Sequence, residues 1–265
     1  MRASLPTEAE LTEIYAQDYF ADAEHRATDG YADYLGDIDH HRRVARRRLH
    51  LLDRVGARKG RLLDVGCAAG FFVDEAASAG WKAEGIDVAE SMINWGRSRL
   101  DASIRVGSLH SVEEPDSFSA VTMWDYLEHS LDPYEDLQRS NELLSNDGVV
   151  AISTGDAGSV AARLMRSRWH LLTPRHHNFF FSVPTLSRLL ERCGFQAVWI
   201  GHPGSRYSIA HLTYKLDRAA RLGFTRRLVT AVSSSRMEHV GIPVNLFDIV
   251  TVIARKRASP TGQVS

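Results

Sequence analysis

The chain lacks the features that mark several large classes of protein. Its 265 residues include only two cysteines, Cys67 and Cys193, which are too few for a disulfide framework and are typical of a reducing compartment. The N-terminal residues are not followed by the apolar stretch of a signal peptide. No apolar run reaches the roughly 18 to 20 residues that span a bilayer. We therefore expect a cytoplasmic protein with no membrane partner.

The chain also lacks an excess of charge of either sign. Its formal net charge is -1, and only four of its 32 basic residues are lysines. Nothing in this balance favours nucleic acid as a partner. With 44% hydrophobic and 25% charged residues, the composition is that of an ordinary globular protein. The length suffices for one large domain, alone or with a cap.

What the sequence does contain is a regular alternation of predicted strands and helices. Short apolar runs predict parallel strands over residues 61–65, 82–88, 104–107, 120–125 and 149–154. Helices are predicted between them over residues 71–79, 91–100 and 132–145. Gly80 is expected to end the first helix, and Asp132 to cap the third. Such alternation is typical of an α/β fold with a parallel sheet.

The pattern changes after residue 155. Residues 156–181 are irregular and rich in histidine, arginine and aromatic residues. The elements predicted beyond them are a helix opened by Ser182 and ended by Gly194, a strand over 196–200, helical segments over 206–222 and 225–238, and a last strand over 246–254. We divide the chain into an N-terminal helical cap (1–55), a main domain (56–257) with insertions at 156–181 and 206–240, and a frayed tail (258–265).

A glycine turn between the first two predicted strands has the character of a cofactor site. Residues 62–70 combine a buried strand with the turn Gly-Cys-Ala-Ala-Gly and the start of a helix. Such a turn brings backbone N–H groups close to a ligand. Asp87 ends the second strand, 21 residues after Gly66. A carboxylate there accepts hydrogen bonds from ribose hydroxyls in sites for NAD and for S-adenosylmethionine (SAM) alike.

Three features favour SAM over a dinucleotide. The turn lacks the G-x-G-x-x-G spacing of dinucleotide sites. Asp64 lies two residues before Gly66, where its carboxylate can hold the ammonium of a methionine moiety but would repel a pyrophosphate. The fourth strand is followed by polar residues up to His129, which places them beside the cofactor at the carboxyl edge of the sheet.

These motifs resemble those of class I SAM-dependent methyltransferases. The chain is similar to the bacterial small-molecule group called methyltransferase family 23, relatives of the ubiquinone-pathway O-methyltransferases. The resemblance covers about residues 15–257, with matching pieces at 62–70, 85–87, 125–129, 143–148, 174–182 and 189–195. Ala68 departs from the pattern, because many members carry a second glycine there; an alanine is tolerated at this position if its φ is negative.

The resemblance implies both a fold and a set of cofactor residues. The fold is α/β: a Rossmann-like, mostly parallel seven-stranded sheet with helices on both faces and an antiparallel last strand. A helical N-terminal cap and a helical insertion before the last strand complete it. The residues implied at the cofactor are Asp64, Gly66, Cys67, Ala68, Gly70, Asp87, Val88, Met92, Ser108, Leu109, Asp125, Tyr126 and Tyr19. We expect Cys67 to be a small packing residue in the turn rather than a nucleophile.

Two histidines are candidate catalytic residues. Methyl transfer from a sulfonium is an in-line displacement, and a hydroxyl acceptor also needs a base, usually histidine. His129 follows the fourth strand, and His177 lies in the segment that the resemblance places over the acceptor; either could instead be structural. Glu128 and His176 lie beside them in sequence and could in principle help to bind a metal. Because no tight ligand spacing such as H-E-x-x-H is present, we expect no metal.

A run of arginines precedes the first strand. Its members are Arg42, Arg43, Arg46, Arg47 and Arg48. On a helix they cover more than one face, so we expect a solvated, partly ion-paired surface. One of them could instead bind a carboxylate or phosphate of the substrate.

The sequence therefore predicts a SAM-dependent methyltransferase that acts on a hydroxyl of a small molecule such as a sugar, a phenol or a natural-product intermediate, with S-adenosylhomocysteine (SAH) as product. An N- or C-methyltransferase of the same fold is the nearest alternative. Methylation of nucleic acid is opposed by the neutral charge and by the lack of an N-P-P-Y-type motif. A non-catalytic protein of this fold is opposed by the intact Asp64 and Asp87. The oligomeric state is not readable from the sequence.

Overall fold

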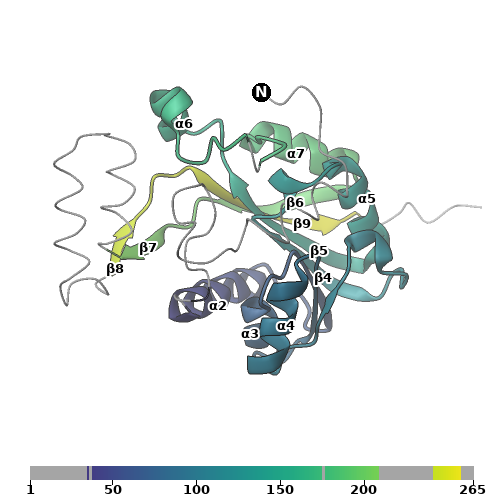
Figure 1. The fold of residues 1–265 in the computed structure, drawn as a ribbon. Helices are drawn as coiled ribbons and strands as arrows, with labels where there is room; N and C mark the ends of the chain where they lie inside the picture. Colours follow the sequence, from purple (N-terminus) through teal and green to yellow (C-terminus); the bar gives the residue numbers. More distant parts are fainter. Residues whose placement is uncertain (1–34, 36–37, 175–176, 209–240, 258–265) are drawn as a thin grey trace, which may run out of the picture.

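A seven-stranded sheet organises this computed structural model (Figure 1). The structure describes residues 35, 38–174, 177–208 and 241–257. Tyr19 and His176, two of the predicted site residues, lie outside the described residues, as does the predicted helix over 225–238.

The sheet has the order β3-β2-β1-β4-β5-β9-β6. Its strands are β1 (Arg61–Val65), β2 (Lys82–Asp87), β3 (Ile104–Val106), β4 (Phe118–Trp124), β5 (Leu144–Gly155), β6 (Phe195–Gly201) and β9 (Ile249–Lys256). The strands from β3 to β5 in this order run parallel to one another, whereas β9 is antiparallel to both β5 and β6. The predicted mostly parallel sheet with an antiparallel last strand is confirmed.

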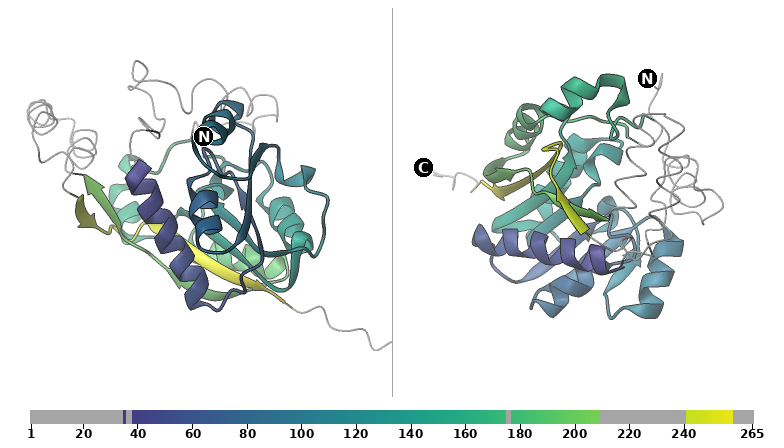
Figure 2. Two further views of the ribbon diagram at one scale, coloured as in Figure 1. Left: turned by 90° about the horizontal axis from the view of Figure 1, so that it is seen from below. Right: turned by 90° about the vertical axis from the view of Figure 1, so that its left-hand side faces the viewer.

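Helices cover both faces of the sheet. The two layers contain α2 (Ile38–Arg54), α3 (Phe71–Ser78) and α4 (Glu90–Arg99) on one face, and α5 (Pro133–Leu143) and α7 (Val183–Arg192) on the other (Figure 1). Because side chains alternate along a strand, the neighbours Leu62 and Leu63 of β1 enter opposite layers of the core. Figure 2 shows α2 lying alongside α3, with which it packs.

Local sequence signals set several helix ends. Gly80 follows α3 with φ 92°, and Gly194 follows α7 with φ 82°. The side chain of Asp132 accepts hydrogen bonds from the first backbone N–H groups of α5. Ser182 opens α7 as part of a reciprocal capping box. These four predictions are confirmed.

The fourth and fifth strands begin earlier than predicted. The fourth strand begins at Phe118, which pairs with Leu144, so β5 also begins earlier than predicted. The register shifts between Phe118 and Ala120. This irregularity accommodates Asp147, whose φ is 64°, within β5. The third strand ends one residue earlier than predicted, and α4 begins and ends one residue earlier than predicted.

The region around residue 206 is not the predicted helix. It begins as a strand, β7 (Ser205–Ser208), which pairs antiparallel with β8 (Gly241–Val244) in a separate two-stranded sheet. Residues 209–240 lie outside the described residues. The last strand begins at Ile249 rather than at 246, because Phe247 has a positive φ of 53° that breaks the extended backbone.

The region 156–181 contains more regular structure than the sequence predicts. A short helix, α6 (Val160–Met165), is followed by a 3₁₀ turn, η4 (Arg166–Arg168). Among the described residues no helix combines the length and the apolar character that crossing a membrane requires.

Candidate functional site

The turn after β1 needs glycine at both ends. Gly66 and Gly70 have φ values of 74° and 84°, which favour glycine. A Cβ atom on Gly66 would lie 2.9 Å from the ring of Tyr126, and one on Gly70 would lie 2.9 Å from Ile104. The two glycines therefore let the backbone approach its surroundings closely, as a cofactor turn requires.

The condition of a negative φ at Ala68 is not met: its φ is 46°. The reason is a hydrogen bond, because the N–H of Ala68 donates to Asp87 Oδ2 at 2.7 Å. Asp87 Oδ1 accepts from the N–H of Ala89 at 2.8 Å. The carboxylate of Asp87 thus ties the turn after β1 to the end of β2, and it holds Ala68 in a conformation that costs an alanine about 1 kcal/mol.

The Asp87 carboxylate is still able to accept further hydrogen bonds. Desolvation raises its pKa, while the N–H groups of Ala89 and Ala68 act in the opposite direction. Each carboxylate oxygen has two acceptor positions, and the N–H groups of Ala68 and Ala89 occupy one position on each oxygen. Hydroxyl groups of a ribose fit the remaining positions.

Asp64 is a buried carboxyl group at the end of β1. It is 2% exposed, and its Oδ1 accepts the hydroxyl proton of Thr122 at 2.6 Å. Burial raises its pKa to about 7, although Thr122 and the charge of Arg48 both lower it. A ligand that brings an ammonium group next to Asp64 would favour the ionised carboxylate. The residues of the turn therefore fit the methionine end of SAM.

The other predicted cofactor residues differ in the exposure of their side chains. Val88 is 40% exposed, Ser108 is exposed, and Met92 is buried beside Phe71. Leu109 is fully buried in the core, so that its backbone alone could face a ligand. The thiol of Cys67 is buried, which raises its pKa well above the usual value, in keeping with a packing role.

Asp125 follows β4 in a constrained conformation, with φ 55°. Its Oδ2 is 2.9 Å from Nη2 of Arg48, and its Oδ1 accepts from the hydroxyl of Ser153 at 2.9 Å. The guanidinium of Arg48 lies over the ring of Trp124, 4.5 Å from the centroid. Tyr126, the next residue, packs against Gly66 and donates its hydroxyl to Asp136 at 3.2 Å.

Arg48 lies at the candidate site, and the sequence did not distinguish it from the other arginines of its run. Two other arginines behave as expected, because Arg42 and Arg46 form ion pairs with Glu75. The spacing of residues along a helix distinguishes Arg48 from the exposed arginines. Arg48 lies three residues after the buried Ala45 and four before the buried Leu52, so it is on the buried side of α2.

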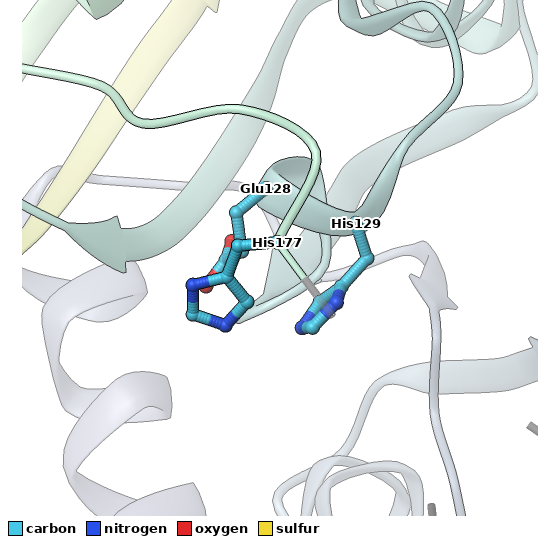
Figure 3. Close-up of side chains that lie close together, drawn as sticks. All are labelled: Glu128, His129 and His177. Atoms are coloured by element: carbon cyan, nitrogen blue, oxygen red, sulfur yellow. The ribbon is translucent and has the colours of Figure 1, made fainter. Parts of the chain in front are cut away.

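The two predicted catalytic histidines lie together. His129 ends the 3₁₀ turn η3 (Leu127–His129) after β4, and the ring of His177 is 4.7 Å from its ring, at an interplanar angle of 83°. Figure 3 shows Glu128 beside both imidazoles. The ring of Phe180 lies 5.9 Å from that of His177. Residues 123 to 129 and 177 to 181 thus meet at the carboxyl edge of the sheet.

Glu128 is buried without a donor for one of its oxygens. It is 5% exposed, and in the described part of the chain no group donates to Oε2. Burial, with the nearby charge of Asp125, raises the pKa of Glu128 to about 8. One ligand atom each from Glu128, His129 and His177 lie within 4.8 Å of one another. Such a cluster can move a proton or accept a divalent cation.

The sequence is similar to those of known methyltransferases. A model of the family described as "Methyltransferase domain" matches residues 38–199. The ubiquinone biosynthesis O-methyltransferase of Xanthomonas campestris pv. campestris (strain B100) is 34% identical over 114 residues, which cover 39% of this chain and 48% of that protein. Its counterpart from Xanthomonas euvesicatoria pv. vesicatoria is 29% identical over 163 residues, which cover 55% and 65%. The chain spans about half the length of the first of these relatives.

Solved structures share the fold at low sequence identity. The magnesium protoporphyrin IX methyltransferase of Synechocystis PCC 6803 with bound SAH has a TM-score of 0.60 at 12% identity, covering 94% of this chain and 100% of that one. A SAM-dependent methyltransferase from Archaeoglobus fulgidus has a TM-score of 0.55 at 20% identity, covering 84% and 100%.

Proposed function

The chain belongs to the methyltransferase domain family, and we propose that it transfers the methyl group of SAM to a hydroxyl group of a small molecule. The observation that carries the proposal is the position of two carboxyl groups, Asp64 and Asp87, around a glycine turn at the carboxyl edge of the sheet, with a pair of histidines at the same edge. The printed names of the curated relatives, which are O-methyltransferases, support a hydroxyl acceptor.

In this proposal each carboxyl group binds one end of the cofactor. Asp64 accepts hydrogen bonds from the ammonium of the methionine moiety, and Asp87 accepts them from the ribose hydroxyls. The turn between Gly66 and Gly70 lies against the ligand, and Val88, Met92 and Ser108 flank the adenine. When bound, SAM supplies an electrophilic methyl carbon on its sulfonium.

The histidine pair takes the proton of the acceptor hydroxyl. An imidazole nitrogen of His177 or His129 would accept this proton as the methyl group passes from the sulfonium sulfur to the acceptor oxygen, and SAH would leave as a neutral thioether. The buried carboxyl of Glu128 lies next to both rings and is mostly protonated at neutral pH, since its pKa is about 8. The neighbouring rings favour O-methylation over N-methylation, because an amine acceptor with a free lone pair requires no base of this kind.

The location of the protein, the class of its acceptor and its division into domains are also proposals. The cysteine content supports a cytoplasmic location, and the neutral net charge supports a small-molecule acceptor rather than nucleic acid. The division at residue 55 into cap and main domain also stays a prediction.

The direct test is transfer of tritiated methyl from SAM to a panel of phenols, sugars and amines, with the methylated atom identified by mass spectrometry. The proposal expects O-methylated products. Products methylated only on nitrogen or carbon would contradict the hydroxyl assignment, and no product with any acceptor would favour a binding protein. Parallel reactions with EDTA and with Mg²⁺ separate the two roles of the cluster: equal rates support histidine as base, and dependence on Mg²⁺ would assign Glu128, His129 and His177 to a cation.

A further inference from the structure

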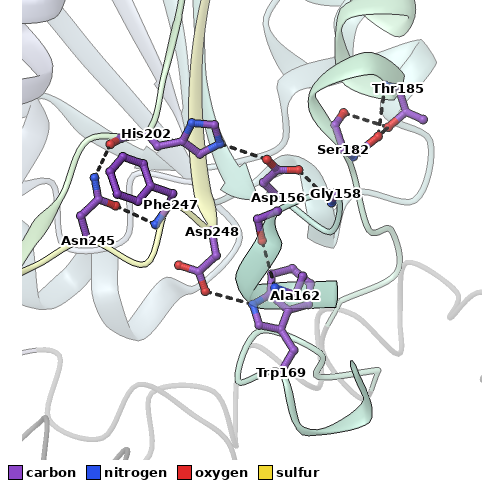
Figure 4. A network of polar contacts seen from close by, with 11 residues as sticks. Asp156, Gly158, Ala162, Trp169, Ser182, Thr185, His202, Asn245, Phe247 and Asp248 are labelled. Atoms are coloured by element: carbon purple, nitrogen blue, oxygen red, sulfur yellow. Dashed lines mark hydrogen bonds and ion pairs between the residues drawn. The ribbon is translucent and has the colours of Figure 1, made fainter. Parts of the chain in front are cut away.

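A second constellation of polar side chains lies at the carboxyl edge of the sheet, beyond β5. Asp156 follows β5, His202 follows β6, and Asp248 precedes β9, so three neighbouring strands bring them together (Figure 4). None of the three belongs to the cofactor turn or to the histidine pair. Both carboxyl groups are buried, with 5% exposure for Asp156 and 4% for Asp248.

Asp156 and His202 form an oriented carboxylate–imidazole pair. His202 Nε2 lies 3.0 Å from Asp156 Oδ2, and Asp156 Oδ1 accepts the N–H of Gly158 at 2.9 Å. The carboxylate therefore holds the imidazole with Nε2–H as the donor, which leaves Nδ1 as an acceptor. No described residue donates to Nδ1, and the His202 side chain is 24% exposed, so this acceptor is open to a ligand.

The loop that carries His202 is held in place from two sides. The carbonyl of His202 accepts from the side chain of Asn245 at 2.8 Å, and the carbonyl of Gly204 accepts from Arg47 at 3.0 Å. The backbone N–H of Asp156 donates to the carbonyl of Asp248 at 2.8 Å. This backbone bond joins the ends of β5 and β9, whereas the Asp156–His202 contact joins the residues that follow β5 and β6.

An exposed aromatic ring stands next to the pair. Phe247 is 62% exposed, and its ring centroid lies 6.3 Å from that of His202. Its φ of 53° is costly for a bulky residue. The conformation is fixed by Asn245, whose side-chain oxygen accepts the N–H of Phe247 at 2.8 Å. Backbone strain that keeps a phenylalanine exposed beside an oriented histidine is typical of a binding surface.

The pair is connected to the catalytic histidines through one short segment. Phe180 contacts His177, and Phe180 also lines a cavity of about 420 Å³ together with Asp156 and Arg163. Ala157 donates to the carbonyl of Phe181 at 2.7 Å. The ends of β4 and β6 are three strand spacings apart, which amounts to about 14 Å.

We propose that His202 and Phe247 form a distal subsite for the acceptor. The acceptor is a molecule longer than a single ring, with a planar ring that packs on Phe247 and a hydroxyl or N–H group that donates to His202 Nδ1, while its reactive hydroxyl reaches His177. The role of this subsite in catalysis rests on the proposed O-methyl transfer. Binding of a ligand to the subsite can be measured without methyl transfer.

The experiment compares two phenolic probes that share a dihydroxylated ring. Quercetin carries this ring on a hydroxylated bicyclic system, whereas catechol is the ring alone. Calorimetry measures quercetin binding to the full chain with and without SAH, in the wild type, His202→Ala, Phe247→Ala and the control Leu246→Ala, an exposed neighbour. Methyl-transfer kinetics on both probes give the ratio of kcat/KM for quercetin to that for catechol.

We expect His202→Ala and Phe247→Ala to weaken quercetin binding at least tenfold and to lower the kcat/KM ratio by a similar factor, with Leu246→Ala like the wild type. Unchanged quercetin affinity in both variants, or no binding of quercetin by the wild type, would overturn the subsite. An equal loss of kcat/KM on both probes with reduced thermal stability would assign His202 to folding instead. If neither probe is methylated while quercetin binding still depends on His202 and Phe247, the transfer proposal fails and the subsite stands.

Discussion

The side-chain amide of Asn178 donates to the carbonyl oxygen of His129 at 2.9 Å. The same amide reaches the carbonyl of Ser130 at 3.2 Å, and the backbone N–H of Asn178 donates to that of Glu128 at 2.8 Å. Since His177 directly precedes Asn178, these bonds fix the position of one imidazole relative to the other.

Removing this amide is expected to separate the two histidines. For Asn178→Ala we predict a fall in kcat of about 10- to 100-fold, the scale of a small misplacement of a catalytic group, with SAH affinity unchanged within about twofold. Asn141→Ala is a matched control, because Asn141 also donates to a backbone carbonyl, that of Gly194, but in α5. Equal kcat values for the two variants would contradict the positioning role.

The histidines themselves should be separable from cofactor binding. We predict that His177→Gln or His129→Gln lowers kcat by about 10²- to 10⁴-fold, the usual contribution of a general base, while calorimetry finds wild-type affinity for SAH. The exposed His50 supplies the control His50→Gln, for which no change is expected. If both site variants kept wild-type kcat, neither residue would be the base.

Glu128 should make the stability of the protein depend on pH. Its folded-state pKa of about 8 lies above the ordinary value of 4.5, so the folded state keeps a proton that the unfolded state loses, and stability falls as pH rises between these values. The slope from this group is at most about 1.4 kcal/mol per pH unit. We predict that Glu128→Gln reduces this slope in urea unfolding from pH 5 to 8. The exposed Glu135→Gln should leave the slope unchanged, and an equal slope for all three proteins would refute the assignment.

Ala68 offers a test of backbone strain in the turn. Glycine at this position relieves a φ of 46° but adds conformational freedom to the unfolded chain, so we predict that Ala68→Gly raises the free energy of unfolding by between 0 and about 1 kcal/mol. Ala69 is fully buried and its φ is not positive. Ala69→Gly should therefore lose about 1 kcal/mol or more. Similar losses in both variants by thermal unfolding would mean that Ala68 is unstrained.

Local signals made much of the fold predictable. The apolar runs that became β1, β2 and β4 are short and flanked by turn residues, and the caps at Asp132 and Ser182 depend on side chains next to the backbone that they bond. The same locality explains why Asp64 and Asp87 could be assigned to strand ends at the sheet edge.

Contacts between distant residues explain what the sequence did not reveal. The φ of Ala68 is set by Asp87 in the next strand, and the ion pair of Arg48 depends on Asp125, which is 77 residues away. The grouping of Glu128 with His177 requires two segments to meet above the sheet. The sequence predicts a helix where the strand at 205–208 lies, because the partner of this strand, at 241–244, is far along the chain.

The measurement that tests the central claim most directly is calorimetric titration of the purified protein with SAH, with NAD alongside, at pH 6 in two buffers of different ionisation enthalpy. The account predicts micromolar binding of SAH, none of NAD, and release of up to one proton, because Asp64 has a pKa of about 7 and must ionise beside the ligand ammonium. Failure to bind SAH would contradict the cofactor site, and binding of NAD in its place would make the turn a dinucleotide site.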